Sequence, residues 1–192
     1  MFENDLKSLS NVTTLRAKRA RFIFKFKYMK KFAHIEDVHR RIFAAMLANM
    51  DDSVGAVMNQ LRKSGLEENT LVFFLSDNGG PTRELTSSNL PLRGEKGQMY
   101  EGAIRVPYMV QWKGKIPAGE VYHQPVSSFD IYATAVANSA GVTVPEQVEG
   151  VDLIPFLKGE DQGRPHATLY WRQGGKAAMR HGDWKIVRVG TR

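Results

Sequence analysis

An uninterrupted apolar segment, from Leu71 to Leu75, is the feature that most constrains the fold of this 192-residue chain. A strand this apolar is typically buried on both faces, as in the middle of a parallel α/β sheet. Residues 35–61 precede it with apolar side chains every three or four positions, which predicts a helix, and Gly65 is a typical helix stop. Helix, short turn, buried strand and glycine loop together predict one crossover unit of an α/β fold.

The remainder of the chain predicts a loop, a second strand, a second helix and a small antiparallel sheet. Residues 81–103 are rich in Ser, Gly, Pro and charge, and this composition predicts a loop. The predicted elements after it are a strand at 106–112, a helix at 128–139, and short strands at 167–172, 176–180 and 183–189 with turns at 174–175 and 181–182.

The net positive charge of the chain comes from its N-terminal region. Residues 1–41 contain eleven Lys and Arg against four Asp and Glu, and the remaining 151 residues contain sixteen of each. A basic segment on a neutral body is not the composition of a nucleic-acid-binding domain, although residues 16–21 would attract phosphates without reading sequence. Residues 22–32 alternate aromatic side chains with lysines, which indicates either a strand or a basic amphipathic stretch.

Several classes of site are excluded by what the sequence lacks. There is no cysteine, which excludes a disulfide, a thiolate metal site and a cysteine nucleophile. No apolar run approaches the ~18 residues of a membrane-spanning helix. Asn4, Asp5, Lys7 and Asn11 interrupt any signal-peptide core, so we expect a cytosolic protein or a chain that begins elsewhere than the natural one. Asn11 also starts a glycosylation sequon, which matters only in a secreted protein.

The predicted strand ends in Asp77-Asn78-Gly79-Gly80, which is open to two interpretations. Ligands bind at the carboxyl ends of strands in α/β sheets, and a carboxylate beside an amide oxygen suits a hard cation such as Ca²⁺. The same four residues are also typical of a simple turn. The motif alone does not separate a metal site from a turn.

A second motif, residues 92–107, places charged side chains between glycines immediately before the second strand. Together with Asp77-Asn78, this motif resembles the sulfatase family. The order of the other segments is similar too. These segments are the predicted helix with Met50-Asp51, then residues 65–70, the Asp130 segment with Ala140-Gly141, residues 150–155, and residues 169–172 and 182–185. The resemblance covers about residues 28–190.

The resemblance implies a fold, a cofactor and a substrate class. The fold would be α/β, a partial alkaline-phosphatase/sulfatase-like sandwich with a small C-terminal antiparallel β subdomain. Residues 1–33 would be a basic segment, 34–160 the second half of the α/β domain, and 161–192 the start of the β subdomain. Asp77 and Asn78 would bind Ca²⁺ and Lys96 would contact the sulfate of a small-molecule sulfate ester or a sulfated sugar. It further implies a secreted, periplasmic or lysosomal protein.

The sequence lacks the residues that carry out catalysis in the sulfatase family. Sulfatases use a formylglycine nucleophile made from Cys or Ser in a Cys/Ser-x-Pro-x-Arg motif, and this chain contains no such motif. The family's paired N-terminal aspartates and Pro-His histidine are absent as well. Ca²⁺ takes 6–8 oxygens, of which Asp77 and Asn78 offer about three. We therefore expect a fragment with half a metal site and no sulfatase activity of its own.

Other polar residues are predicted to be structural. Arg93, Glu101 and Arg105 are expected to form ion pairs that stabilise the loop. The histidines are expected at helix-entry, loop or surface positions: His34, His39, His123, His166 and His181.

Two alternative functions remain open from the sequence. One is a phosphohydrolase or phosphotransferase of the same superfamily, although no Asp-x-x-x-His set of additional metal ligands is seen. The other is a non-enzymatic binding protein that uses residues 16–31, without sequence-specific nucleic-acid recognition.

Overall fold

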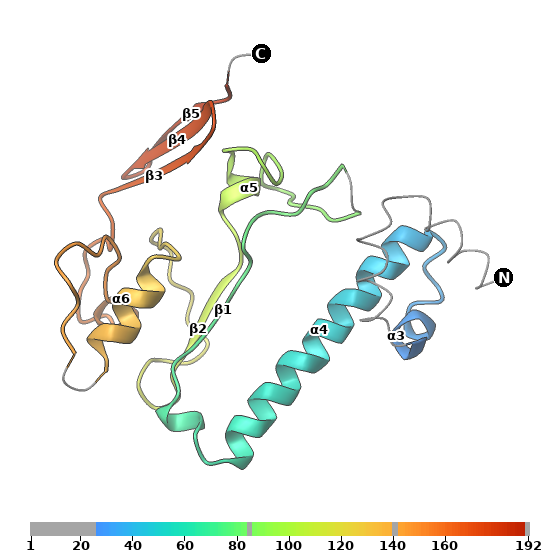
Figure 1. The fold of residues 1–192 in the computed structure, drawn as a ribbon, viewed down its shortest axis with the longest axis horizontal. Coiled ribbons are helices and arrows are strands. Elements are labelled where there is room, and N and C mark those ends of the chain that lie inside the picture. The colour runs from blue at the N-terminus through green and yellow to red at the C-terminus, as the bar shows by residue number, and fades with distance from the viewer. Residues whose placement is uncertain (1–25, 84–85, 140–141, 191–192) are drawn as a thin grey trace. The chain divides into compact units, whose positions relative to one another are not determined.

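The computed structural model describes residues 26–83, 86–139 and 142–190 (Figure 1). The chain forms two compact units, one of residues 1–63 and 80–88 and the other of residues 64–79 and 89–192. The predictions for the sequon at Asn11 and for the basic residues 16–21 lie outside the described residues. None of the helices described is both long enough and apolar enough to span a membrane.

The long helix predicted from the apolar periodicity is confirmed in the first unit. Helix α4 runs from Val38 to Lys63. Asp37 caps its N-terminus, because its Oδ1 accepts a 2.7 Å hydrogen bond from the backbone N–H of Arg40, one of the donors that a helix leaves unpaired. Ahead of it, Phe26–Lys31 form helix α3, so this part of the basic segment is a helix and not a strand.

Helix α3 packs against α4 through a buried aromatic side chain. Tyr28 is 5% exposed, and its hydroxyl donates a 2.6 Å hydrogen bond to Asp52, which also pairs with Lys27 at 2.9 Å. Ala45 is the buried residue of α4. Several apolar side chains of α4 remain exposed in the described structure: Met46, Leu47, Met50 and Val57.

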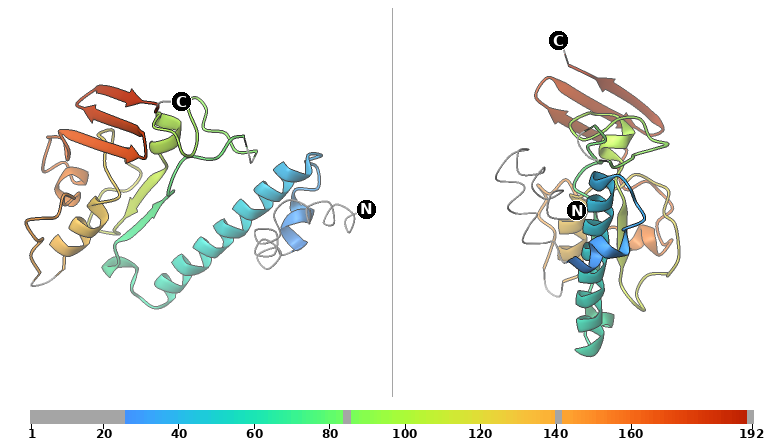
Figure 2. Two further views of the ribbon diagram at one scale, coloured as in Figure 1. Left: turned by 45° about the horizontal axis from the view of Figure 1, so that its top comes forward. Right: turned by 90° about the vertical axis from the view of Figure 1, so that its right-hand side faces the viewer.

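In the second unit, the predicted buried strand is β1, Val72–Leu75, and it pairs with β2, Tyr108–Gln111. The pairing is antiparallel, with Leu75 opposite Tyr108 (Figure 2). The sequence predicted a parallel sheet, and no parallel pair occurs among the described strands. The apolar run indicated burial, but it carries no information about the direction of the neighbouring strand, and all four residues of β1 are only half-buried.

The antiparallel C-terminal sheet is confirmed, but its second turn lies at 182–183 and not at the predicted 181–182, because His181 pairs with Trp184. Its strands are β3 (Thr168–Gln173), β4 (Lys176–His181) and β5 (Trp184–Arg188), in the order β3-β4-β5 with both pairs antiparallel. Leu169 and Ala178 are buried on one face, whereas Tyr170, Trp184 and Ile186 are exposed on the other. This alternation is that of a sheet covered on one side only.

The core of the second unit forms around helix α6, Asp130–Ala137, within the range predicted for a helix. Ala133 and Thr134 are fully buried there, and Leu153 and Ile154 pack into the same core. Two short helices, Glu101–Ile104 (α5) and Ile154–Leu157 (α7), were not predicted. A helix of four residues is too short to show an apolar period.

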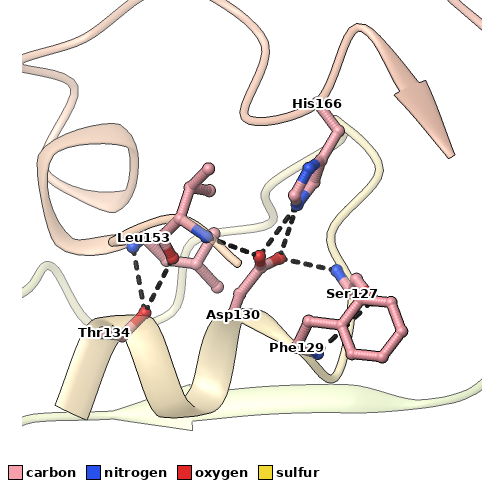
Figure 3. A network of polar contacts seen from close by, with 7 residues as sticks. Ser127, Phe129, Asp130, Thr134, Leu153 and His166 are labelled. Carbon is pink, nitrogen blue, oxygen red and sulfur yellow. Dashed lines mark hydrogen bonds and ion pairs between the residues drawn. The ribbon is translucent and has the colours of Figure 1, made fainter. Parts of the chain in front are cut away.

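A buried carboxylate, Asp130, joins three segments in this core (Figure 3). It is 0% exposed and accepts backbone N–H bonds from Ser127 at 2.7 Å and from Val151 at 3.0 Å. Nε2 of His166 lies 2.8 Å and 3.0 Å from its two oxygens. Because a carboxylate only accepts hydrogen bonds, Nε2 carries the hydrogen.

The prediction that His166 lies in a loop is confirmed, but the network shows that its side chain is largely buried and is not part of the surface. Its side chain is 9% exposed and paired with Asp130, although it sits in a connecting segment. The pKa of the Tyr108 hydroxyl is raised to about 12, mainly by burial and to a smaller extent by the negative charge of Asp130. The other four histidines are exposed, as predicted: His34, His39, His123 and His181.

Asp130→Asn should lower the free energy of unfolding by about 1–3 kcal/mol, because one oxygen that accepts buried hydrogen bonds is replaced by an amide NH2 that cannot accept them. Urea denaturation followed by circular dichroism measures the loss. Asp183→Asn is the matched control, since Asp183 pairs with Arg164 at 2.9 Å but is 86% exposed. That change should cost about 0–1 kcal/mol. Equal losses in the two variants would contradict the role given to Asp130.

Candidate functional site

The candidate metal ligands lie in the loop that follows β1. Asp77 is exposed, and its Oδ1 accepts a 2.9 Å hydrogen bond from the backbone N–H of Asn78. The Asn78 amide donates to the carbonyl of Gly79 at 3.1 Å, and the Ser76 hydroxyl donates to the carbonyl of Asn78 at 2.8 Å. These bonds shape the loop and leave Oδ2 of Asp77 and Oδ1 of Asn78 without a partner in the described chain.

The candidate sulfate-binding lysine lies at the tip of a tight turn. The N–H of Gln98 donates to the carbonyl of Glu95 at 3.0 Å, which places Lys96 and Gly97 in the two central positions of a β-turn. Gly97 has a φ of 82°, the left-handed value that the third residue of a type II turn requires. Lys96 is exposed, and its ammonium makes no hydrogen bond or ion pair within the described residues.

Backbone contacts join these two loops. Because β1 and β2 are antiparallel, the end of β1 lies beside the start of β2, and the N–H of Ser76 donates to the carbonyl of Pro107 at 3.1 Å. The N–H of Gly79 then donates to the carbonyl of Ala103 at 2.8 Å. The Gly79 backbone lies so close to Gly102 that an added Cβ would overlap the Gly102 carbonyl oxygen. The loops with Asp77 and Lys96 are thus fixed to each other without intervening side chains.

Glu101, the first residue of α5, forms the ion pairs expected of it. Its Oε1 lies 2.6 Å from Nζ of Lys185, and its Oε2 lies 3.1 Å from a guanidinium nitrogen of Arg180. Burial by itself raises the pKa of the Glu101 carboxyl. The hydrogen bond from Lys185 and the charges of Lys185 and Arg180 outweigh that effect, and the pKa is lowered.

The two arginines behave differently from the prediction. The guanidinium of Arg93 stacks over the Tyr100 ring at 4.0 Å and donates to the Tyr100 hydroxyl at 3.2 Å, so its partner is an aromatic ring and not a carboxylate. Arg105 is exposed, and its guanidinium pairs with no described residue.

The residues present are suitable for a hard cation but do not complete a site. Asp77 and Asn78 offer one carboxylate and one amide oxygen, the ligand types that Ca²⁺ prefers. Within the described residues, no group of three or more His, Asp or Glu side chains is arranged to hold a metal ion. A cation bound here would need further oxygens in addition to these two side chains.

A comparison with protein families decides the classification. The sulfatase family model matches residues 19–141, which is more than half of the chain. The chain belongs to the sulfatase family.

Individual sulfatases match over similar lengths. The chain is 36% identical to human steryl-sulfatase over 138 residues, or 67% of this chain and 24% of that protein. It is 37% identical to mouse N-acetylgalactosamine-6-sulfatase over 142 residues, or 71% of this chain and 27% of that protein. The chain therefore spans about a quarter of the length of these relatives.

Solved structures confirm the fold class. The crystal structure of Ps i-CgsB in complex with k-i-k-neocarrahexaose matches with a TM-score of 0.77 and 34% identity, covering 86% of this chain and 38% of that one. A phosphonate monoester hydrolase from Silicibacter pomeroyi shares the fold, with a TM-score of 0.62 at 22% identity. The chain is thus part of an α/β sandwich of the alkaline-phosphatase-like type with a small antiparallel β sheet.

The structure shows contacts with the Lys96 loop that the sequence interpretation missed. The Nζ of Lys176 donates a 2.7 Å hydrogen bond to the carbonyl of Gly97, the residue after Lys96. Lys185 and Arg180 are the partners of Glu101. In the β4–β5 pairing Arg180 lies directly opposite Lys185, whereas the turn predicted at 181–182 would have placed Arg180 opposite Asp183.

Gly79→Ala should lower the free energy of unfolding by about 1–3 kcal/mol, because the added methyl group meets the Gly102 carbonyl. Hydrogen exchange of the residue-79 amide should also accelerate as its bond to Ala103 is lost. Gly55→Ala is the matched control, since no atom lies within 4 Å of its added Cβ in α4. Alanine in a helix interior is neutral or stabilising by ~0.5–1 kcal/mol. A neutral Gly79→Ala would contradict the close approach of the two loops.

Proposed function

We propose that this chain supplies part of the active site of a sulfatase that hydrolyses the sulfate esters of aryl or sugar substrates. Lys96 contacts the sulfate group, while Asp77 and Asn78 contribute oxygens to the Ca²⁺ site. The formylglycine nucleophile used in the family has no precursor motif in these 192 residues.

One observation carries the proposal: the hydrogen bond from Gly79 to Ala103 holds the Asp77-Asn78 loop against the segment that carries Lys96. A sulfate ester places negative charge on its sulfuryl oxygens and, during hydrolysis, on the leaving oxygen. A cationic group fixed at this edge of β1–β2 neutralises that charge. When bound, Ca²⁺ adds Lewis-acid stabilisation of the same oxygens.

The side chains have suitable chemistry for these roles. The Lys96 ammonium is exposed and unpaired within the described residues, so an incoming anion does not have to displace a carboxylate. The free Oδ2 of Asp77 and Oδ1 of Asn78 are hard oxygen ligands. The relatives named steryl-sulfatase and N-acetylgalactosamine-6-sulfatase support a sulfate ester as the substrate class. The phosphonate monoester hydrolase match supports the fold alone.

Sulfate binding tests the role of Lys96. In an NMR titration of the 192-residue protein with sodium sulfate at constant ionic strength, the amides of residues 95–98 should shift saturably. Lys96→Ala should weaken binding about tenfold or more, because a hydrogen bond to a charged group contributes about 1.5–3 kcal/mol. Lys115→Ala is the matched control, as Lys115 is exposed in the turn at the other end of β2. Equal binding in wild type and Lys96→Ala would overturn the assignment.

Turnover tests the second part of the proposal. The purified 192-residue protein should not hydrolyse a chromogenic aryl sulfate in the presence of Ca²⁺, because it contains no Cys/Ser-x-Pro-x-Arg motif from which the formylglycine nucleophile is made. Product release measured over hours against a buffer blank gives the result. Hydrolysis that disappears in Lys96→Ala would show that the chain has its own nucleophile.

A further inference from the structure

The β3–β5 sheet contacts the Lys96 loop at two separate points. Lys176 of β4 donates a 2.7 Å hydrogen bond to the carbonyl of Gly97, immediately after Lys96. Lys185 of β5 lies 2.6 Å from Glu101, four residues further along the chain. Figures 1 and 2 show β3–β5 beside α5, at the end of the β1–β2 ribbon where β1 finishes.

We propose that Glu101 and Lys176 are positioning residues for Lys96, and that the inner face of the β3–β5 sheet fixes the anion-binding turn. This inference rests on the proposed role of Lys96 in sulfate binding. Neither Glu101 nor Lys176 contacts the sulfate in this proposal. They act by holding the backbone on the C-terminal side of Lys96.

The Glu101 ion pairs are favourable because the carboxylate offsets the repulsion between two cationic side chains of the sheet. Arg180 and Lys185 are directly opposite each other on β4 and β5, and like charges at such positions destabilise a sheet. Each oxygen of the Glu101 carboxylate takes one of the two cations. The Lys185 side chain is only 11% exposed, so it is largely removed from the water that would otherwise screen its charge. Loss of Glu101 would therefore leave two facing cations without compensation.

The hydrogen bond from Lys176 is made to the residue immediately after Lys96. A lysine ammonium donates to the Gly97 carbonyl, and a glycine at that position is otherwise the most freely rotating point of the turn. On the other side of Lys96, the Asn89 amide donates to the carbonyl of Gly94 at 3.0 Å. With both flanking segments fixed, the turn is ordered before the anion arrives, and less conformational entropy is lost on binding.

Side chains alternate between the two faces of the sheet. The three cations that contact the Lys96 loop or Glu101 therefore share one face, and another cation of the same strands lies on the opposite face. Lys176 and Arg180 lie on the face of β4 that includes the buried Ala178, and Lys185 lies opposite Arg180. Arg188 of β5 is opposite Ala177, on the other face, and is exposed. Arg188 therefore carries the same charge on the same sheet without contacting the Lys96 loop.

Sodium sulfate titration of the full 192-residue chain tests the proposal, with amide hydrogen exchange of Gln98 and Gly102 as a local probe. Glu101→Gln and Lys176→Met should each weaken Lys96-dependent binding by about tenfold, the scale on which residues that orient a ligand-binding group act. Exchange at Gln98 and Gly102 should accelerate in both variants. Arg188→Met, the matched control, should change neither quantity.

The pH dependence tests whether the effect of Glu101 comes from its ionised carboxylate. The pKa of Glu101 lies below its ordinary value of 4.5, so its ion pairs are complete above that pH and are lost as the pH falls through the lowered pKa. The advantage of wild type over Glu101→Gln in sulfate affinity should therefore be constant above about pH 5 and vanish at lower pH. A difference in affinity that persists at low pH would show that the effect of the variant does not come from the ionised carboxylate, and would contradict the role given to the ion pairs.

The outcomes distinguish this inference from the proposed function. If Lys96→Ala does not affect sulfate binding, the proposed function fails. Hydrogen exchange at Gln98 and Gly102 then still shows whether the sheet orders the turn. If binding depends on Lys96 but is unchanged in both Glu101→Gln and Lys176→Met, the positioning role is wrong. Should Glu101→Gln fail to fold, Lys176→Met still decides the result, because it removes one hydrogen bond and leaves the ion pairs intact.

Discussion

The close backbone approach of Gly79 and Gly102 is the constraint on which the candidate site depends. No side chain fits between these two residues, and the N–H of Gly79 bonds directly to the carbonyl of Ala103. The antiparallel pairing of β1 and β2 makes the approach possible, because it brings the end of one strand beside the start of the other. Asp77 and Lys96, which are distant in sequence, therefore belong to one edge of the sheet.

Support for that edge extends back to the core through the C-terminal sheet. The buried Asp130 holds His166, which lies two residues before β3 begins at Thr168. Strand β3 pairs with β4 and β4 with β5, and these two strands carry the cations that bind Glu101 and the Gly97 carbonyl. The segment that leads into this sheet is thus held in the core by the hydrogen bond between Asp130 and His166.

Local patterns in the sequence predicted the elements, but not most of the contacts between them. Helix α4 and strands β3–β5 follow from apolar periodicity and glycine turns, which are properties of neighbouring residues. The direction of the strand paired with β1 and the partner of His166 depend on residues far away in the chain, and composition does not reveal them. Asp77, Asn78 and Lys96 could be named only through the resemblance to sulfatases. The partners of Glu101 could not be predicted either, because the turn predicted at 181–182 would place Arg180 opposite Asp183 and not opposite Lys185.

The same ion pairs bear on the role proposed for Lys96 in binding sulfate. Glu101 lies five residues after Lys96, and a free glutamate there would compete with a sulfate group for the ammonium. Both oxygens of Glu101 are instead occupied by Lys185 and Arg180. The C-terminal sheet therefore has two effects on the turn. It fixes the backbone beside Lys96, and it neutralises the carboxylate that would otherwise be an internal competitor for the substrate.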